Sequence, residues 1–251
     1  LYEDEGWQSY RAPDELIASN HVRAFAQDTL GFLWLASETG LYQVEPAADR
    51  VVQRFTSANT TFPVEAITTL YAAPDGGLWV GGTGAAFFDG VQWQSYTKAD
   101  GLAADQVQAI AGDAQQRIWI GTNAGLSIWN GQSFFTLTRA DRLPSNNILA
   151  LLADGATMWI GSDAGLLHFE ENRFQVYTIA TTDLAGNRIT TLAKEADGTI
   201  LVGTDQGLSR WADKVMRVIP ETETYPISAL GLAKPNRIWL GTNGKGVLYF
   251  D

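Results

Sequence analysis

Polar side chains recur at two fixed positions of a repeated sequence, and a ligand could bind where these positions meet. Carboxylate and amide oxygens there would accept hydrogen bonds from hydroxyl-rich or cationic ligands and would repel anions. The alternative is turn chemistry, because Asn and Asp cap turns through their own backbone. The first position holds Glu38, Thr83, Asn123, Asp163, Asp205 and Asn243, and the second holds Asn20, Glu65, Asp105, Asn146, Asn187 and Tyr225. We select as candidate ligand-binding residues Glu38, Asn123, Asp163, Asp205, Asn243, Asn146 and Asn187.

The residues that usually carry catalysis are few. His21 and His168 are the only histidines, and there is no cysteine. His21 precedes the first repeat's inner strand. One hypothesis is that it acts as a general acid or base, and the simpler one is that it is a solvated loop residue. His168 occupies a third strand and is expected to serve packing. No Ser-His-Asp spacing, metal-binding His pair or phosphate-binding Gly loop is evident. We therefore predict that the chain is not an enzyme and holds no metal or cofactor.

A set of aspartates falls at the turns between the first and second strands, on the opposite face from the two polar positions. A calcium site would need several converging oxygens, so turn formation is the simpler role. These residues are Asp28, Asp75, Asp113, Asp154 and Asp197.

Composition narrows the partners. The chain has 251 residues, 45% of them hydrophobic, and a net charge of −11. No basic cluster is present, so nucleic acid and anionic lipid are poor candidates. No run of about 18 apolar residues occurs, so no membrane span is expected. The chain begins at Leu1, from which we expect a processed or excised piece of a longer protein.

The elements that would position the polar residues come from a sixfold repeat. "IWIGTNAGLSIWNG", from Ile118, returns as "MWIGSDAGLLHFEEN" and "ILVGTDQGLSRWADK", with three more divergent copies. The anchors recur at spacings of 38 to 45 residues, and they are Trp34, Trp79, Trp119, Trp159, Leu201 and Trp239. Each copy contains four short runs rich in Val, Ile and aromatic residues and bounded by Gly, Asn and Asp, which predicts four strands.

Four strands in about 40 residues are typical of a β-propeller blade. The predicted fold is therefore all-β, a six-bladed β-propeller in one domain over residues 1–251. Because a lone sheet cannot bury both faces, we expect the Trp anchors to pack between blades; the alternative is a sugar-binding aromatic on each blade.

The fourth strands show how the propeller would close. Each has two large residues separated by two others, of which at least one is polar, and the pairs are Val52 with Phe55, Trp93 with Tyr96, Phe134 with Leu137, Phe174 with Tyr177, and Met216 with Ile219. The sixth unit ends after its third strand, and "WQSY" at Trp7 to Tyr10 supplies the missing pair. We predict that residues 6–10 complete the last blade, residues 226–250, which protects the sheet edge.

The repeat resembles the two-component regulator propeller repeat. The fourth unit shows the pattern well, with Asn147-Ile148, Asp154, Trp159-Ile160-Gly161-Ser162 and Gly165-Leu166. Departures are Ala85-Ala86 in place of Gly-Leu and Leu201 in place of Trp. The resemblance implies an extracytoplasmic sensor propeller, periplasmic or at the cell surface, which is either an excised domain of a larger receptor or a stand-alone relative.

These observations lead to one principal hypothesis, a non-enzymatic recognition propeller that binds a small molecule or glycan at one face. A protein-interaction scaffold is the second hypothesis, and a propeller lyase is the third.

Overall fold

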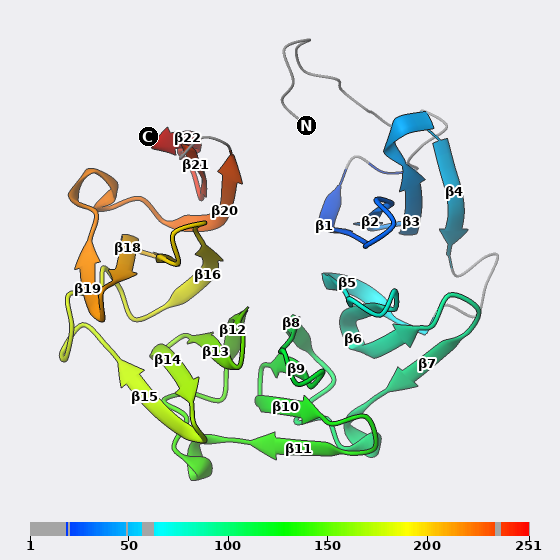
Figure 1. Ribbon diagram of the computed structural model, residues 1–251, viewed down its shortest axis with the longest axis horizontal. Coiled ribbons are helices and arrows are strands. Elements are labelled where there is room, and N and C mark those ends of the chain that lie inside the picture. Colours follow the sequence, from blue (N-terminus) through cyan, green and yellow to red (C-terminus); the bar gives the residue numbers. More distant parts are fainter. Residues whose placement is uncertain (1–18, 20, 49, 57–62, 234–236, 251) are drawn as a thin grey trace. The chain divides into compact units, whose positions relative to one another are not determined.

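The computed structural model describes residues 19, 21–48, 50–56, 63–233 and 237–250 (Figure 1). The chain divides into two compact units, Leu1–Ser95 and Tyr96–Asp251. Each of the six repeats forms one antiparallel sheet, which confirms the all-β, six-bladed propeller fold class. The described helices are the three-residue 3₁₀ segments η1 (Pro46–Ala48), η2 (Lys98–Asp100), η3 (Arg139–Asp141) and η4 (Pro220–Thr222). In these described ranges, no helix has the length and apolar character needed to cross a membrane.

The first unit contains two sheets. The first sheet runs in the order β1 (Val22–Gln27), β2 (Leu33–Ser37), β3 (Gly40–Glu45) and β4 (Arg50–Phe55). The second consists of β5 (Glu65–Ala72), β6 (Leu78–Phe88) and β7 (Trp93–Tyr96). The single strand β6 spans the second and third strand positions of this repeat, with Gly84 at a φ of 90° in its middle.

The second unit contains the other four sheets, in the same sequential order. The third sheet contains β8 (Val107–Gly112), β9 (Ile118–Thr122), β10 (Gly125–Trp129) and β11 (Phe134–Leu137), and the fourth contains β12 (Ile148–Asp154), β13 (Thr157–Ser162), β14 (Gly165–Glu170) and β15 (Arg173–Tyr177). The fifth sheet contains β16 (Ile189–Lys194), β17 (Ile200–Thr204), β18 (Gly207–Ala212) and β19 (Val215–Val218). The sixth contains β20 (Ile227–Ala233), β21 (Arg237–Thr242) and β22 (Gly246–Phe250). Within this unit the first strands of neighbouring sheets contact one another.

The repeat anchors form the apolar core between neighbouring sheets. Trp34, Trp79, Trp119, Trp159 and Leu201 are buried, and Trp239 is half-buried. Trp159 of β13, for example, packs in one cluster with Ile189 and Val202 of the next sheet. The prediction that the anchors pack between blades is confirmed for Trp34, Trp119, Trp159 and Leu201, which share clusters with residues of the next sheet. Sheets that bury both faces in this way gain about 25 cal/mol for each Å² of apolar surface removed from water.

The fourth strands bear out most of the predicted pairs. The last large residue of each pair is buried, and these residues are Phe55, Tyr96, Leu137, Tyr177 and Ile219. Of the first large residues of the pairs, Val52 alone is exposed (46%), and the other four are buried or half-buried. The register explains why, because Val44 pairs with Val51 and Gln43 with Gln53, which leaves Val52 as the unpaired residue of a bulge.

The predicted closure involves residues outside the described ranges. In the described part of the chain the sixth sheet consists of β20, β21 and β22. Residues 6–10 are not among the described residues, so their pairing with the last blade stays a prediction, as does the single domain over residues 1–251.

Candidate ligand-binding site

The turn between the second and third strands presents one side chain at its exposed tip. In the third sheet, the Thr122 hydroxyl donates to the Gly125 carbonyl (2.8 Å) and accepts from the Ala124 N–H (3.1 Å). Ser162 and Thr204 make the same bonds in the next two sheets. These bonds fix the turn and leave the residue between them, Asn123 in this sheet, facing outward.

Glycine is required at the end of this turn. Gly165 has a φ of 141°, and a Cβ placed there would lie 2.9 Å from the Tyr177 carbonyl oxygen. Another side chain would therefore be strained in backbone and in space. The Thr-x-x-Gly spacing thus builds the turn that displays the candidate residues.

Each turn is tied to the residue that precedes the first strand of its own sheet. The backbone N–H groups of Asn123, Asp163, Asp205 and Asn243 donate to the carbonyl oxygens of Gln106, Asn147, Arg188 and Pro226, at 2.9 to 3.3 Å. We call this edge of each sheet, formed by the second-to-third turn and the start of the first strand, the upper edge. The lower edge carries the turns from the first to the second strand and from the third to the fourth.

Side chains are also paired across the upper edge. Asn123 Nδ2 donates to Gln106 Oε1 (2.9 Å), and Asn147 Nδ2 donates to Asp163 Oδ2 (3.0 Å). Gln108 Nε2 donates to Asn147 Oδ1 (2.7 Å), which links the third sheet to the fourth. A polar chain therefore runs along the upper edges of neighbouring sheets.

Asp163 is held as a carboxylate in this chain. Burial raises the pKa of Asp163, but hydrogen bonds from Ser145 and Asn147 and the charge of Arg188 outweigh it, so the net pKa is lowered. The side chain is exposed. It offers a fixed, negatively charged acceptor to solvent or to a ligand.

The second predicted position serves loop structure. Asn146 Oδ1 accepts the Arg139 N–H (2.7 Å), and Asn187 Oδ1 accepts the Ile179 N–H (2.9 Å). Asp105 Oδ1 accepts the Lys98 N–H in the same way. These bonds anchor the loop that leaves the preceding fourth strand. The turn interpretation of these residues is thus confirmed, while a role in ligand binding stays a prediction.

The residues that meet the displayed turns are one position further along the chain. His21, Gln106 and Asn147 reach the side chains of Glu38, Asn123 and Asp163. The sequence prediction took the preceding residue in each case. A signal was available, since these residues directly precede the first apolar residue of each inner strand.

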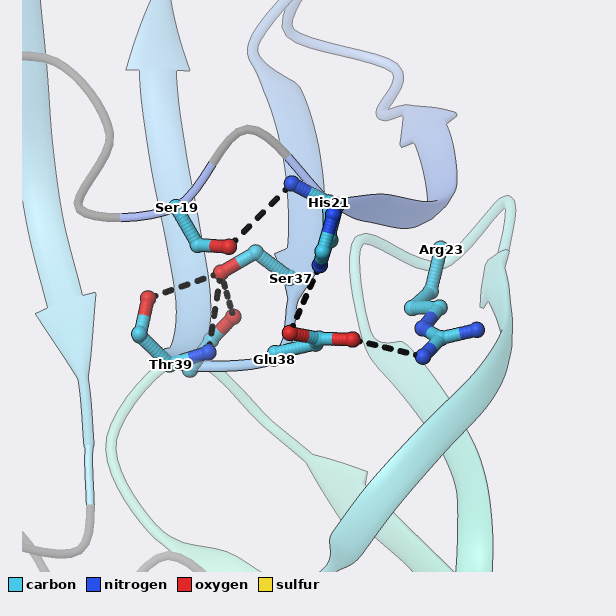
Figure 2. A network of polar contacts seen from close by, with 7 residues as sticks. Ser19, His21, Arg23, Ser37, Glu38 and Thr39 are labelled. Carbon is cyan, nitrogen blue, oxygen red and sulfur yellow. Dashed lines mark hydrogen bonds and ion pairs between the residues drawn. The ribbon is translucent and has the colours of Figure 1, made fainter. Parts of the chain in front are cut away.

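In the first unit the upper edge holds an ion-paired cluster (Figure 2). Glu38 lies between two basic groups: His21 Nδ1 is 2.8 Å from its Oε2, and Arg23 Nη2 is 2.7 Å from its Oε1. The hydrogen bond with His21 is the main cause that lowers the pKa of Glu38, and Arg23 lowers it further. The interpretation of His21 as a simple solvated residue is therefore incomplete, because His21 is exposed but paired.

A cavity of about 800 Å³ lies beside this cluster, within the first unit. Its walls come from Arg23 of β1, the β2–β3 turn and the start of β5. The lining includes the hydroxyls of Ser37, Thr39, Thr56 and Thr68, the charged groups of Arg23, Glu38 and Glu65, and the apolar Val64, Ala66 and Ile67. Its volume falls in the range of small-molecule sites, roughly 300–1,000 Å³.

The lower edge is structural. Asp28 and Asp113 accept the indole N–H of Trp34 (3.0 Å) and Trp119 (2.8 Å) and cap their own turns.

His168 of β14 is buried and stacks on Trp159 with ring centroids 4.1 Å apart, which confirms its packing role. Burial lowers the pKa of His168. The described residues contain no group of three or more His, Cys, Asp or Glu side chains placed to hold a metal.

Comparison with known proteins supports the repeat type and the fold. The family model for the two component regulator propeller matches residues 101–124, which confirms the resemblance at that repeat. A comparison with curated proteins gives no match.

Solved structures similar to the chain include two extracellular domains from B. thetaiotaomicron. One comes from a protein described as the hybrid two component system BT3049 (TM-score 0.77, 19% identity, 93% of this chain and 34% of that chain). The other comes from a protein described as the one component system BT4673 (TM-score 0.73, 24% identity, covering 91% of this chain and 32% of that chain). The chain thus spans about a third of the length of these two.

The fold is also shared by an enzyme. A catalytically inactive virginiamycin B lyase from Staphylococcus aureus, solved with quinupristin, is similar with a TM-score of 0.70 and 13% identity, over 97% of this chain and 87% of that chain. At such identities the similarity establishes the propeller fold.

Proposed function

We propose that the chain is the ligand-recognition propeller of an extracytoplasmic sensor, part of a larger receptor, and that it acts by binding rather than by catalysis. In the second unit it would take a small molecule or glycan at the upper edges of the sheets, through Asn123, Asp163, Asp205, Asn243, Asn146 and Asn187. In the first unit the proposed ligand-binding residue is Glu38. The similar extracellular domains of signalling proteins support this role.

The observation that carries the proposal is the repeated display of polar side chains at the upper edge. In successive sheets the same tight turn exposes Asn123, Asp163 and Asp205, while the apolar residues of the strands beneath are buried. A fixed scaffold of this kind loses little conformational entropy on binding, which favours affinity. Side chains that differ between sheets on an otherwise repeated turn suit selective recognition.

The test is ligand titration of a double variant at the upper edge. A thermal-shift screen against sugars, peptides and divalent cations supplies the ligand, and calorimetry measures its affinity. Asp163→Ala with Asp205→Ala should weaken binding well over tenfold, because a hydrogen bond to a charged group contributes about 1.5–3 kcal/mol. Both residues are exposed, so the melting temperature should change little.

A matched control uses the lower edge of the fifth sheet. Asp197 and Asp213 are also exposed turn aspartates, and replacing both with Ala keeps the same change in net charge. This control should leave affinity unchanged. Equal affinity in the upper-edge variant and the wild type, or loss of affinity in the control instead, would place the site elsewhere.

A further inference from the structure

The cavity of the first unit contains opposite charges that are free to act on a ligand. Arg23 is 58% exposed and spends one N–H on Glu38. A guanidinium has five N–H donors, so most of them remain for another partner. Both carboxylate oxygens of Glu38 are occupied, one by Arg23 and one by His21 (Figure 2). Glu38 therefore orients Arg23, and about two of its four lone-pair sites stay open.

Glu65 supplies the second charge. It lines the same cavity from the first residue of β5, and its side chain is exposed. Among the described residues it has no side-chain hydrogen bond or ion pair. A carboxylate with no partner of its own attracts an ammonium group.

The remaining wall of the cavity is divided between apolar and hydroxyl groups. Val64 and Ile67 are buried residues whose surfaces reach the cavity, 3% and 6% exposed. They offer an apolar contact within the cavity that Arg23 and Glu65 also line. The hydroxyls of Ser37 and Thr39 are already bonded to each other, 2.9 Å apart. The cavity thus joins a cationic donor group, a free anionic acceptor and an apolar surface.

We propose that this cavity binds a small zwitterion that carries both an ammonium and a carboxylate group, namely a free amino acid or a short peptide. The carboxylate pairs with Arg23, because a guanidinium can donate two parallel N–H bonds to it. The ammonium pairs with Glu65, and an apolar side chain lies against Val64 and Ile67. This inference rests on the proposed function and names the class of ligand at one part of the upper edge.

Simple ions fit this cavity less well. An anion at Arg23 would face the carboxylates of Glu38 and Glu65, and a cation at Glu65 would face Arg23. A zwitterion places its carboxylate at the remaining donors of Arg23 and its ammonium at Glu65 without adding net charge. The volume of about 800 Å³ exceeds what one amino acid fills, so it leaves room for a second residue.

The experiment is calorimetric titration of the full chain with four matched probes. L-leucine and the dipeptide Leu-Leu carry both charges, leucinamide lacks the carboxylate, and N-acetyl-leucine lacks the ammonium. We expect leucine or Leu-Leu to bind at least tenfold more tightly than the two singly charged probes. The stronger of the two zwitterions distinguishes a free amino acid from a peptide.

Two variants identify which side chain recognises which group. Arg23→Gln should bind leucine and leucinamide almost equally, because the carboxylate has lost its partner. Glu65→Gln should bind leucine and N-acetyl-leucine almost equally. Arg50→Gln is the matched control, since Arg50 forms a similar exposed pair with Glu45 (2.7 Å) that does not line the cavity. Its discrimination among the probes should equal that of the wild type.

Two results would overturn the inference: no binding of either zwitterion, or discrimination that survives in both cavity variants with melting temperatures unchanged. Its failure is separable from failure of the proposed function. A sugar or other ligand whose affinity depends on Asp163 and Asp205 would uphold the function and still contradict the zwitterion site.

Discussion

Trp119 and Asn123 are only four residues apart in the third sheet, yet the residue type is nearly constant between repeats at the position of Trp119 and variable at that of Asn123. The position of Trp119 carries a large apolar side chain in all six repeats and is buried in five of them. The position of Asn123 is acidic, amide or hydroxyl in different repeats. Packing between sheets admits a narrow range of side chains, whereas an exposed turn tip admits many. The side chains at the turn tips of the upper edge can therefore differ between blades without disturbing the core.

The upper edge itself differs between the two units. In the first unit it holds an exposed His–Glu–Arg cluster beside a cavity, and in the second it holds amide and carboxylate pairs that bond to one another. Exposed ion pairs contribute little to stability, about 0–1 kcal/mol. The cluster at Glu38 therefore adds little to the stability of the fold.

The largest effect is expected in the core. Trp119→Ala or Trp159→Ala should each lower the free energy of unfolding by about 3–5 kcal/mol, because a large buried side chain leaves a cavity between sheets. Urea unfolding followed by far-UV circular dichroism measures this. Trp239→Ala is the control and should cost less, since Trp239 is half-buried. A cost below about 1 kcal/mol for either buried Trp would contradict the comparison.

A comparable effect should follow deletion of residues 1–10. If Trp7 and Tyr10 complete the last blade, the deletion removes a packed aromatic and leaves a sheet edge unpaired, which costs about 3–5 kcal/mol for the Trp alone. We expect a lower melting temperature and self-association in size-exclusion chromatography. A shortened chain that stays monomeric with an unchanged melting temperature would exclude this closure.

Two aspartates in lower-edge turns, Asp113 and Asp154, test whether the hydrogen bonds of each side chain determine its contribution to stability. Asp113 is buried and accepts bonds from the Trp119 indole, the Arg117 guanidinium and two backbone N–H groups. Asp113→Ala should cost about 2–4 kcal/mol because these donors lose a charged acceptor. Asp154 instead pairs with the part-exposed Lys194, so Asp154→Ala should cost about 0–1 kcal/mol. Chemical denaturation of the two variants would show equal costs if the turn alone mattered.

The blade interior could be predicted from the sequence because one physical demand, burial of an apolar residue, repeats at fixed spacing. Trp119, Trp159 and Leu201 followed that demand. Val52 did not, since a bulge shifts the register of β4 by one residue, and no residue of the sequence predicts that bulge.

The upper edge was predictable only in part. The turn position of Asn123 and Asp163 was located from the Gly that ends the turn. The partner position was missed by one residue, because Asn146 and Asn147 are equally polar and only the fold decides which one reaches Asp163. The ion pairing of Glu38 depends on Arg23, which lies within a strand and has no counterpart in the other repeats.

The adjacent residues Asn146 and Asn147 allow the two roles to be separated. Asn146→Ala removes the acceptor of the Arg139 N–H and should lower the free energy of unfolding by about 1 kcal/mol. Because Asn146 is also one of the proposed ligand-binding residues, its loss should weaken an upper-edge ligand by roughly two- to tenfold, as expected for one neutral hydrogen bond of about 0.5–1.5 kcal/mol. Denaturation and calorimetry on the same sample measure both quantities. An affinity within about twofold of the wild type would leave Asn146 as a loop anchor alone.

The smallest effect should appear in the titration of Asp163. Asn147 donates to its Oδ2, and this bond is one cause that lowers the pKa of Asp163. Asn147→Ala should therefore raise that pKa toward its ordinary value, and Asn146→Ala should not. A group whose pKa is lowered on folding stabilises the protein above its unfolded pKa, and this contribution is lost as the pH falls through the folded pKa. The Asn147 variant should thus lose slightly less stability than the wild type between neutral and acidic pH. Carboxyl carbon chemical shifts recorded by NMR across the acidic range resolve the change, and an unchanged pKa in the Asn147 variant would show that Ser145 and Arg188 alone hold Asp163 charged.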